Sequence, residues 1–200
     1  MKKSLTVGCV IMASGLSRRF GANKLLADFC GQPMLCRAFA ATATPGISAR
    51  IVVTRSEEVQ ALCRAQGVPA LLHSLPGRND TVRLGLSALL EQLPELNSCM
   101  FLPGDQPLLR RESVGMLVDF YREHPEHIAA LGHDGVRGNP CLFPARLFPE
   151  LLALQGDHGG NQVIRRHEED LLLWEVPAPE LTDVDTPQVL AQLRRDMAEE

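Results

Sequence analysis

An apolar run that ends in a glycine- and serine-rich loop is the strongest constraint on the fold. Residues 5–13 are almost all apolar, as expected of a strand that helices cover on both faces. The loop that follows, residues 14–24, carries three cations, Arg18, Arg19 and Lys24. Successive backbone N–H groups in such a loop form a concavity that binds anions, and the cations add full charges. The stretch predicts a strand that delivers a phosphate-binding loop, although a solvated turn after an edge strand has the same local pattern.

The glycines of this loop distinguish it from two common phosphate-binding motifs. Gly15 and Gly21 have no Cβ, so the backbone there can adopt positive φ and approach a ligand closely. Five residues separate the two glycines, and no Lys-Ser or Lys-Thr pair follows the second one, which excludes a Walker loop. The Gly-x-Gly-x-x-Gly fingerprint of dinucleotide-binding proteins is absent from the loop as well.

Strand-like and helix-like segments alternate along the rest of the chain. Short apolar runs predict strands at residues 5–13, 50–54, 70–73, 98–102, 128–131, 141–143 and 171–175. Helical spacing and capping residues predict helices at 31–42, at 56–65, from Asp80 or Thr81 through Leu90, and at 111–123, 145–154, 159–167 and 187–197. The alternation predicts an α/β fold: a single domain over residues 1–200, with a mostly parallel sheet flanked by helices on both faces. Ligands of such sheets bind at the carboxyl ends of the strands.

Charge and composition exclude several classes of partner. The chain has 200 residues, a net charge of −4 and a pI near 5.9, which argues against nucleic acid and acidic membranes as partners. The local positive charge of the loop therefore indicates a small anionic ligand. The six cysteines are scattered, with no Cys-x-x-Cys pair, as expected of free thiols in a reducing compartment. No apolar run has the length of a membrane span, and we expect a cytoplasmic protein.

Two aspartates lie in turns that suit metal ligands. Asp105 follows an apolar run inside a rigid Pro-Gly-Asp-Gln-Pro turn. Asp185, and with less support Asp183, lies in an Asp-Val-Asp-Thr-Pro loop near the C-terminus, where a helix cap is an equal interpretation. Carboxylate oxygens suit Mg²⁺, which proteins bind through one or two carboxylates plus substrate phosphates. Loop and aspartates together favour nucleotidyl transfer from a nucleoside triphosphate, with Mg²⁺ as cofactor.

The loop also resembles that of a known family. Residues 13–26, Ala-Ser-Gly-Leu-Ser-Arg-Arg-Phe-Gly-Ala-Asn-Lys-Leu-Leu, resemble the signature of the molybdenum cofactor nucleotidyltransferases, in particular the cytidylyl-transferring branch. Ser14 and Phe20 depart from that branch, which usually has Ala and Met there. Residues 104–109, 138–144, 156–160 and 183–187 resemble further segments of the family, with Asn139 in place of a His. Residues 78–86 instead resemble the methylerythritol phosphate cytidylyltransferases, which also use CTP.

The resemblance implies a fold, a reaction and a set of site residues. The fold is a single Rossmann-like nucleotidyltransferase domain over residues 1–200. The reaction is transfer of CMP from CTP to the terminal phosphate of molybdopterin, with release of pyrophosphate. The resemblance implies that Arg19, Lys24 and Asp105 are catalytic and that Asp105 and Asp185 bind the metal ion. The implied nucleotide-binding residues are Ala13, Ser14, Gly15, Leu16, Ser17, Arg19, Lys24, Asp80, Thr81 and Gly104. The implied acceptor-binding residues are Asn139, Pro140, Asp157 and His158. The guanylyl branch usually has Gly at the position of Ser14, so a side chain there narrows the space for a purine and favours CTP.

Three hypotheses remain open at this point. The favoured one is a molybdenum cofactor cytidylyltransferase whose product goes to a molybdenum hydroxylase. The second changes the base or the acceptor: guanylyl transfer to molybdopterin, or cytidylyl transfer to a sugar-alcohol phosphate such as methylerythritol phosphate. The third is a non-catalytic accessory protein that binds the cofactor. Lys24, Asp105 and Asp185 are all present, which favours catalysis.

Overall fold

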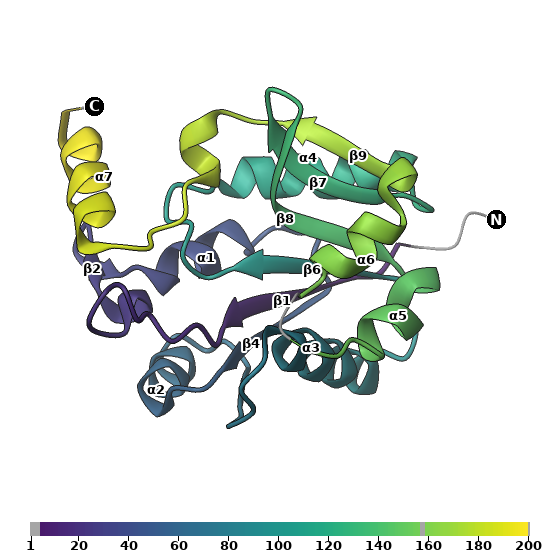
Figure 1. Ribbon diagram of the computed structural model, residues 1–200, viewed down its shortest axis with the longest axis horizontal. Helices are drawn as coiled ribbons and strands as arrows, with labels where there is room; N and C mark the ends of the chain where they lie inside the picture. Colours follow the sequence, from purple (N-terminus) through teal and green to yellow (C-terminus); the bar gives the residue numbers. More distant parts are fainter. Residues whose placement is uncertain (1–4, 157–158, 200) are drawn as a thin grey trace.

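The computed structural model describes residues 5–156 and 159–199, and its centre is a seven-stranded sheet. The strands are β1 (Val7–Ala13), β4 (Ala49–Thr54), β5 (Ala70–Leu72), β6 (Ser98–Pro103), β7 (Ile128–His133), β8 (Val136–Pro144) and β9 (Leu171–Glu175). Their order in the sheet is β5-β4-β1-β6-β8-β7-β9 (Figure 1). Neighbouring strands are parallel except at β8, which runs antiparallel to β6 and β7. The predicted α/β fold with a mostly parallel sheet is confirmed.

Helices pack on both faces of this sheet (Figure 1). They are α1 (Leu35–Ala41), α2 (Glu57–Ala65), α3 (Arg78–Gln92), α4 (Arg111–Glu123), α5 (Phe148–Leu152), α6 (Asn161–Arg166) and α7 (Pro187–Glu199). Alternate residues of β1 face opposite sides, as strand geometry requires. Cys9 and Ile11 pack in one core cluster with α1, α2, α4 and α7, whereas Val10 packs in the other with α3, α5 and α6. Burial on two faces explains why the strands read as unbroken apolar runs.

Helix α3 approaches the sheet closely at a glycine. A Cβ on Gly85 would lie 2.5 Å from Cγ1 of Val10 and 3.1 Å from Cγ2 of Val53. A larger residue would therefore push the helix away from the sheet. Gly85 therefore lets the middle of α3 pack closely against β1 and β4.

The predicted helix at 31–42 begins too early. Residues Gln32–Pro33 form β3, which pairs with β2 (Asp28–Phe29), and α1 starts only after this ribbon. Cys30 and Gly31 have φ values of 54° and 88°, left-handed values that reverse the chain into a hairpin. The proline that suggested a first helical turn therefore lies in a strand.

Two other boundaries differ from prediction. The N-cap of α3 is Gly77, and Asp80 is the third helical residue, whose carboxylate accepts a hydrogen bond from the Gly77 N–H at 2.9 Å. Strand β8 extends well beyond the predicted 141–143. The reason is a tight two-residue turn between β7 and β8, formed by Asp134 and Gly135 with φ values of 51° and 73°.

The strand directions bring three separate loops to one edge of the sheet. Strand β9 runs parallel to β7, and β7 has the same direction as β1 and β6. The carboxyl ends of β1, β6 and β9 therefore meet at one edge, the edge at which open α/β sheets bind ligands. None of the described helices is both long and apolar enough to cross a membrane.

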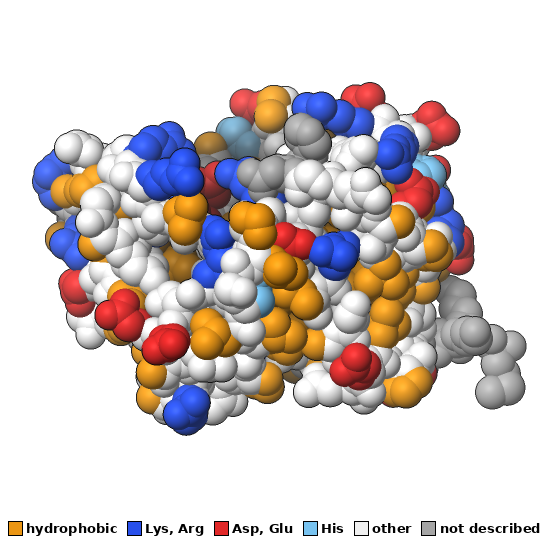
Figure 2. Space-filling view, turned by 60° about the horizontal axis from the view of Figure 1, so that its bottom comes forward, with side chains coloured by type: hydrophobic (Ala, Val, Ile, Leu, Met, Phe, Trp, Pro, Cys, Tyr) orange, Lys and Arg blue, Asp and Glu red, His pale blue; other side chains and the backbone are white. Residues whose placement is uncertain are grey.

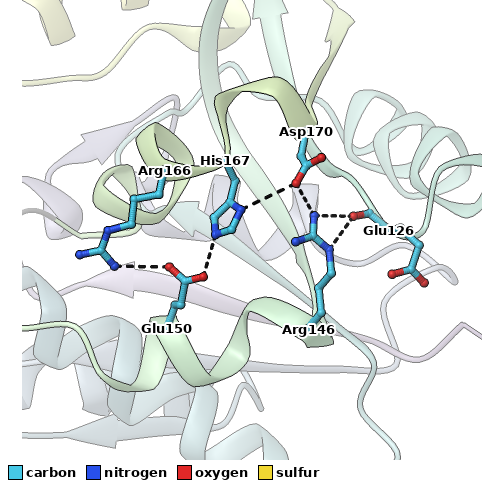
Figure 3. Close-up of polar contacts among 6 residues, drawn as sticks. All are labelled: Glu126, Arg146, Glu150, Arg166, His167 and Asp170. Carbon is cyan, nitrogen blue, oxygen red and sulfur yellow. Dashed lines mark hydrogen bonds and ion pairs between the residues drawn. The ribbon is translucent and has the colours of Figure 1, made fainter.

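The opposite edge of the sheet is held by a polar network beside the starts of β7 and β9 (Figure 3). Arg146, just after β8, donates to the carbonyl oxygen of Glu126 at 2.8 and 3.0 Å and pairs with Asp170 at 2.6 Å. His167 Nε2 lies 2.7 Å from Oε1 of Glu150. The hydrogen bond with His167 is the main cause that lowers the pKa of Glu150.

We expect Glu150→Gln to lower the Tm at pH 7 by about 1–3 °C, because the variant loses the charge that pairs with Arg166 and bonds His167. The folded-state pKa of Glu150 lies below its unfolded value. Its contribution is therefore present above the unfolded pKa and is lost as the pH falls through the folded pKa. Thermal unfolding between about pH 3 and pH 8 checks this, with exposed Glu91→Gln as control. A Tm difference that persists unchanged at the acidic end would contradict it.

Candidate active site

A cleft of about 720 Å³ opens at the edge where the strands end. Its lining comes from the loop after β1, the end of β6, the start of α3, part of β8, the start of α6 and the loop before α7. On the face shown in Figure 2, acidic and basic side chains are interspersed with apolar ones and form no continuous basic surface. Inside the cleft, basic and acidic side chains form direct ion pairs.

Lys24 is the centre of this charge cluster. Its Nζ lies 2.5 Å from Oδ2 of Asp105 and 3.0 Å from Oδ1 of Asp185, and only 10% of its side chain is exposed. The other oxygen of Asp185 lies 2.7 Å from Nη2 of Arg19. One ammonium group therefore joins three loops that are far apart in the sequence, and the predicted cations and carboxylates lie together.

The surroundings of these groups shift their pKa values. Burial alone would lower the pKa of Lys24, but the charges of Asp105 and Asp185 and their hydrogen bonds outweigh it and raise that pKa. Lys24 therefore stays protonated at neutral pH. Burial acts to raise the pKa of Asp185, yet the hydrogen bonds and charges of Lys24 and Arg19 lower it. Burial, and then the charge of Asp105, raise the pKa of Asp183.

Local hydrogen bonds give the loop after β1 its shape. Ser17 has a φ of 48°, and its hydroxyl accepts a hydrogen bond from the Lys24 N–H at 3.2 Å. Asn23 caps the short 3₁₀ turn that begins at Lys24, since its side chain accepts from the Leu25 N–H at 3.2 Å. Lys24 therefore enters the cleft from a hydrogen-bonded turn.

The turn that carries Asp105 packs directly against β1. The Gly104 N–H donates to the Met12 carbonyl at 3.0 Å. A Cβ on Gly104 would lie 3.3 Å from that oxygen and 2.9 Å from Cδ1 of Leu35. The Val184 N–H donates to the Asp105 carbonyl at 2.9 Å, so the loop before α7 is tied to the same turn.

The donor set suits a divalent cation that is bound together with phosphate. The carboxylates of Asp105 and Asp185 both contact the Lys24 ammonium, so they lie close enough together to bind one cation between them. Beside them, Oδ1 of Asp183 accepts a hydrogen bond from the Gln106 amide at 3.0 Å. Within the described ranges, no three His, Cys, Asp or Glu side chains form a complete metal site. Mg²⁺ fits the set because it is commonly held by one or two carboxylates together with phosphates and water.

Most residues that the sequence predicted for the site line the cleft. They are Ala13, Ser14, Gly15, Leu16, Ser17, Arg19, Lys24, Thr81, Asp105, Asn139 and Asp185. Asp80, Gly104 and Pro140 are not among its lining residues. Asp157 and His158 lie outside the described residues.

The three residues that do not line the cleft have contacts of their own. The Asp80 carboxylate binds Arg83 and the Gly77 N–H, and it lines a neighbouring cavity. The hydrogen bond from Arg83 is the main cause that lowers the pKa of Asp80. Gly104 allows the close packing against β1. Pro140 lies inside β8, which begins before the strand predicted at 141–143.

Several cleft residues were missed by the sequence analysis. Phe101 and Phe143 pack edge to face, with ring centroids 5.7 Å apart, and line the cleft together. Asn161 lines it from the start of α6, and Arg55 from just after β4. The position of Arg55 at the carboxyl end of a strand was the one available signal. The Thr81 hydroxyl is buried and has no hydrogen-bond partner among the described residues.

We expect Gly104→Ala to destabilise the protein by about 1–3 kcal/mol, because the new Cβ would meet the Met12 carbonyl and Leu35. For a chain of this size, that change lowers the Tm by at least about 2 °C. Gly15→Ala is the matched control, since nothing lies within 4 Å of a Cβ at Gly15. Thermal unfolding of both variants without ligand checks this, and equal Tm values would contradict the close packing of the turn.

Comparison with known proteins gives relatives over the whole chain and over part of it. The family model of the MobA-like NTP transferase domain matches residues 9–171. Purine catabolism protein PucB of Bacillus subtilis is 24% identical over 215 residues, which cover 99% of this chain and 100% of that protein. The 3-deoxy-manno-octulosonate cytidylyltransferase of Neisseria meningitidis serogroup A is 31% identical over 113 residues, or 56% of this chain. The match spans 44% of the length of that enzyme.

Solved structures share the fold at low sequence identity. Rv0371c of Mycobacterium tuberculosis has a TM-score of 0.82 at 22% identity, covering 96% of this chain and 99% of that one. A second Rv0371c structure, in complex with manganese, has a TM-score of 0.74 at 20% identity, covering 95% and 98%. CMP:2-keto-3-deoxy-manno-octonic acid synthetase in complex with CTP has a TM-score of 0.76 at 19% identity, covering 97% and 99%. The family match extends over most of the sheet and over the loop that holds Lys24, and the chain belongs to the family of MobA-like NTP transferase domains.

Proposed function

We propose that this protein transfers CMP from CTP to the terminal phosphate of molybdopterin, as a molybdenum cofactor cytidylyltransferase. The observation that carries the proposal is the contact of Lys24 and Arg19 with Asp105 and Asp185 inside the cleft. A nucleoside triphosphate with its metal ion needs charges of both signs, and this cluster supplies them beside a glycine-containing loop. Membership of the NTP transferase family supports the same class of reaction.

In the proposed reaction, an oxygen of the acceptor phosphate forms a bond to the α-phosphorus of CTP. The bond from that phosphorus to the oxygen shared with the β-phosphate breaks, and pyrophosphate leaves with the electron pair. The attacking phosphate is already an anion, so the chain needs neither a nucleophilic side chain nor a general base. The protein has to hold the two reactants in line and to neutralise the charge that develops.

Each charged residue has a part in this scheme. Lys24, which its raised pKa keeps protonated, and Arg19 bind the triphosphate and stabilise the departing pyrophosphate. Asp105 and Asp185 would hold Mg²⁺, which when bound neutralises charge on the phosphate oxygens. The neighbour in complex with manganese supports a divalent cation. In the structure Lys24 is paired with both carboxylates, so binding of the nucleotide includes an exchange of its partners.

The choice of CTP rests on the first residue of the loop and on the relatives. Ser14 has a side chain where the guanylyl branch usually has none. Its hydroxyl is held 3.1 Å from the Val53 carbonyl and 2.8 Å from Nε2 of His73, so it is fixed in place at the edge of the cleft. The partial match to a cytidylyltransferase and the neighbour that binds CTP support the same base.

The acceptor side of the cleft combines aromatic rings with amides. The almost wholly buried rings of Phe101 and Phe143 form the apolar part of the lining, and Asn139 and Asn161 supply hydrogen-bonding groups. A flat heterocycle with a polar edge, such as a pterin, suits this wall better than a small polyol phosphate. Arg137, a cation that could otherwise bind the phosphate of a polyol phosphate, instead donates to Oδ1 of Asn161 at 2.9 Å.

We propose that the enzyme acts in the cytoplasm and that a molybdenum hydroxylase receives its product.

The test is pyrophosphate release with Mg²⁺, each of the four nucleoside triphosphates, and each of three acceptors: molybdopterin, methylerythritol phosphate and 3-deoxy-manno-octulosonate. The last acceptor is included because of the partial relative. We expect release with molybdopterin, and a kcat/KM for CTP at least about tenfold above that for GTP, roughly 1.4 kcal/mol. A kcat/KM for GTP above that for CTP would contradict the choice of CTP. CMP transfer only to another acceptor would contradict the choice of molybdopterin. Release with no combination would leave a non-catalytic cofactor-binding protein.

We expect Asp105→Asn to slow this reaction by on the order of a hundredfold or more, because a charge beside the transferred phosphate is lost. Asp119→Asn on the surface of α4 is the control, since that side chain is 71% exposed and does not line the cleft. Thermal unfolding shows whether both variants are folded. Near wild-type turnover of folded Asp105→Asn would remove this residue from the metal site.

A further inference from the structure

The carbonyl oxygen of Ser14, at the start of the loop, is held by a guanidinium fork. Arg55 Nε donates to this oxygen at 2.9 Å and Arg55 Nη2 at 2.7 Å. A planar guanidinium that donates twice to one oxygen fixes the direction of the carbonyl more firmly than a single bond would. Arg55 directly follows β4, so the fork ties the loop after β1 to the neighbouring strand.

Fixing this carbonyl also fixes the next amide. The peptide unit between Ser14 and Gly15 is planar, and in a trans peptide the C=O and the N–H point in opposite directions. The fork on the Ser14 oxygen therefore directs the Gly15 N–H away from Arg55. Gly15 lines the cleft, and its N–H meets no acceptor in the described part of the chain.

We propose that Arg55 is a positioning residue that aims the Gly15 N–H at a phosphate oxygen of the bound triphosphate, an inference that rests on the proposed function. A preorganised N–H stabilises phosphate charge without a reorganisation cost at the moment of binding. Arg55 acts on the ligand through the peptide that it holds. Its own charge is a separate effect, which the experiment below distinguishes.

The same guanidinium reaches a second wall of the cleft. Arg55 Nη1 lies 3.3 Å from the Pro76 carbonyl and 3.5 Å from that of Leu75. Pro76 and Gly77 line the cleft ahead of α3. Arg55 therefore links the loop after β1 to the segment that leads into α3. A lysine keeps the charge but cannot make these branched contacts.

A histidine holds the same residue through its side chain. The Ser14 hydroxyl has one proton, which it donates to the Val53 carbonyl at 3.1 Å. It must then accept from Nε2 of His73 at 2.8 Å, which assigns the proton of the neutral ring to Nε2. Burial, and then the charge of Arg55, lower the pKa of His73, in keeping with a neutral ring. Ser14 is thus held at both its carbonyl and its hydroxyl.

The test uses inorganic tripolyphosphate with Mg²⁺ as the probe, so that its outcome depends on neither the base nor the acceptor. Binding is measured by calorimetry for wild type, Arg55→Lys, Arg55→Gln and, as control, Arg64→Gln on the exposed side of α2. The amide resonances of Gly15 and Lys24 are followed by ¹H–¹⁵N spectra of the ligand-free proteins. Thermal unfolding shows whether each variant is folded, and Arg55→Lys keeps the charge if Arg55→Gln fails to fold.

We expect both Arg55 variants to bind tripolyphosphate about tenfold more weakly or worse, because each loses the fork. The Gly15 amide resonance should shift in both ligand-free variants, and Arg64→Gln should match wild type. Binding within about twofold of wild type for Arg55→Lys, with a loss for Arg55→Gln, would show that charge alone acts and would overturn the proposal. An unmoved Gly15 resonance would overturn it as well. If wild type binds tripolyphosphate but releases no pyrophosphate from any nucleotide, the proposed function fails while this comparison still decides the role of Arg55.

Discussion

The cleft depends on one ammonium group between two carboxylates. Asp105 follows β6 and Asp185 precedes α7, and without a cation between them their like charges would repel each other. Lys24 lies within 3.0 Å of both, at the end of a loop that follows a third element, β1. It is also the only lysine in the sequence after Lys3. A single side chain therefore links its own loop to the two loops that carry the carboxylates.

The rest of the sheet makes this contact possible. Parallel strands covered on both faces bring the three loops to the same edge, and the hairpin partner β8 supplies the opposite wall of the cleft. Gly104 lets the Asp105 turn pack on β1, and the Val184 N–H ties the last loop to that turn. The charges that pair with one another in the ligand-free cluster also suit a metal–triphosphate. The triphosphate would pair with Lys24 and Arg19, and the metal ion with Asp105 and Asp185. The proposed function therefore needs an exchange of partners and no rearrangement of strands.

The sequence predicts Lys24 and Asp105 because each follows a strong local signal, whereas the loop of Asp185 suits a helix cap equally well. Lys24 and Asp105 lie in glycine-containing turns directly after buried strands, and strands that alternate with helices imply a shared edge. Asp80 was misplaced because the start of α3 is set by the extended backbone of Gly77, which has no capping side chain to mark it. The early start of the predicted helix at 31–42 has a similar cause, because a cysteine in the sequence does not indicate the left-handed backbone that Cys30 adopts.

Arg55 and His73 could not be predicted for a different reason. Each is a lone residue at the end of a strand, and each acts through the backbone or hydroxyl of Ser14, which is distant in sequence. No spacing rule connects such residues, because their contact is created by the order of β1, β4 and β5 in the sheet. Contacts of this kind appear only when the chain is folded.

A double-mutant cycle between Lys24 and Asp105 tests the central contact most directly. The free energies of unfolding of wild type, Lys24→Met, Asp105→Asn and the double variant are measured by chemical denaturation at neutral pH, without nucleotide or metal. The account predicts that the effects of the two substitutions are not additive: the double variant should be more stable than the sum of the single effects implies, by at least about 1 kcal/mol. Additivity within about 0.5 kcal/mol would show that the two side chains do not stabilise one another, and would contradict the account.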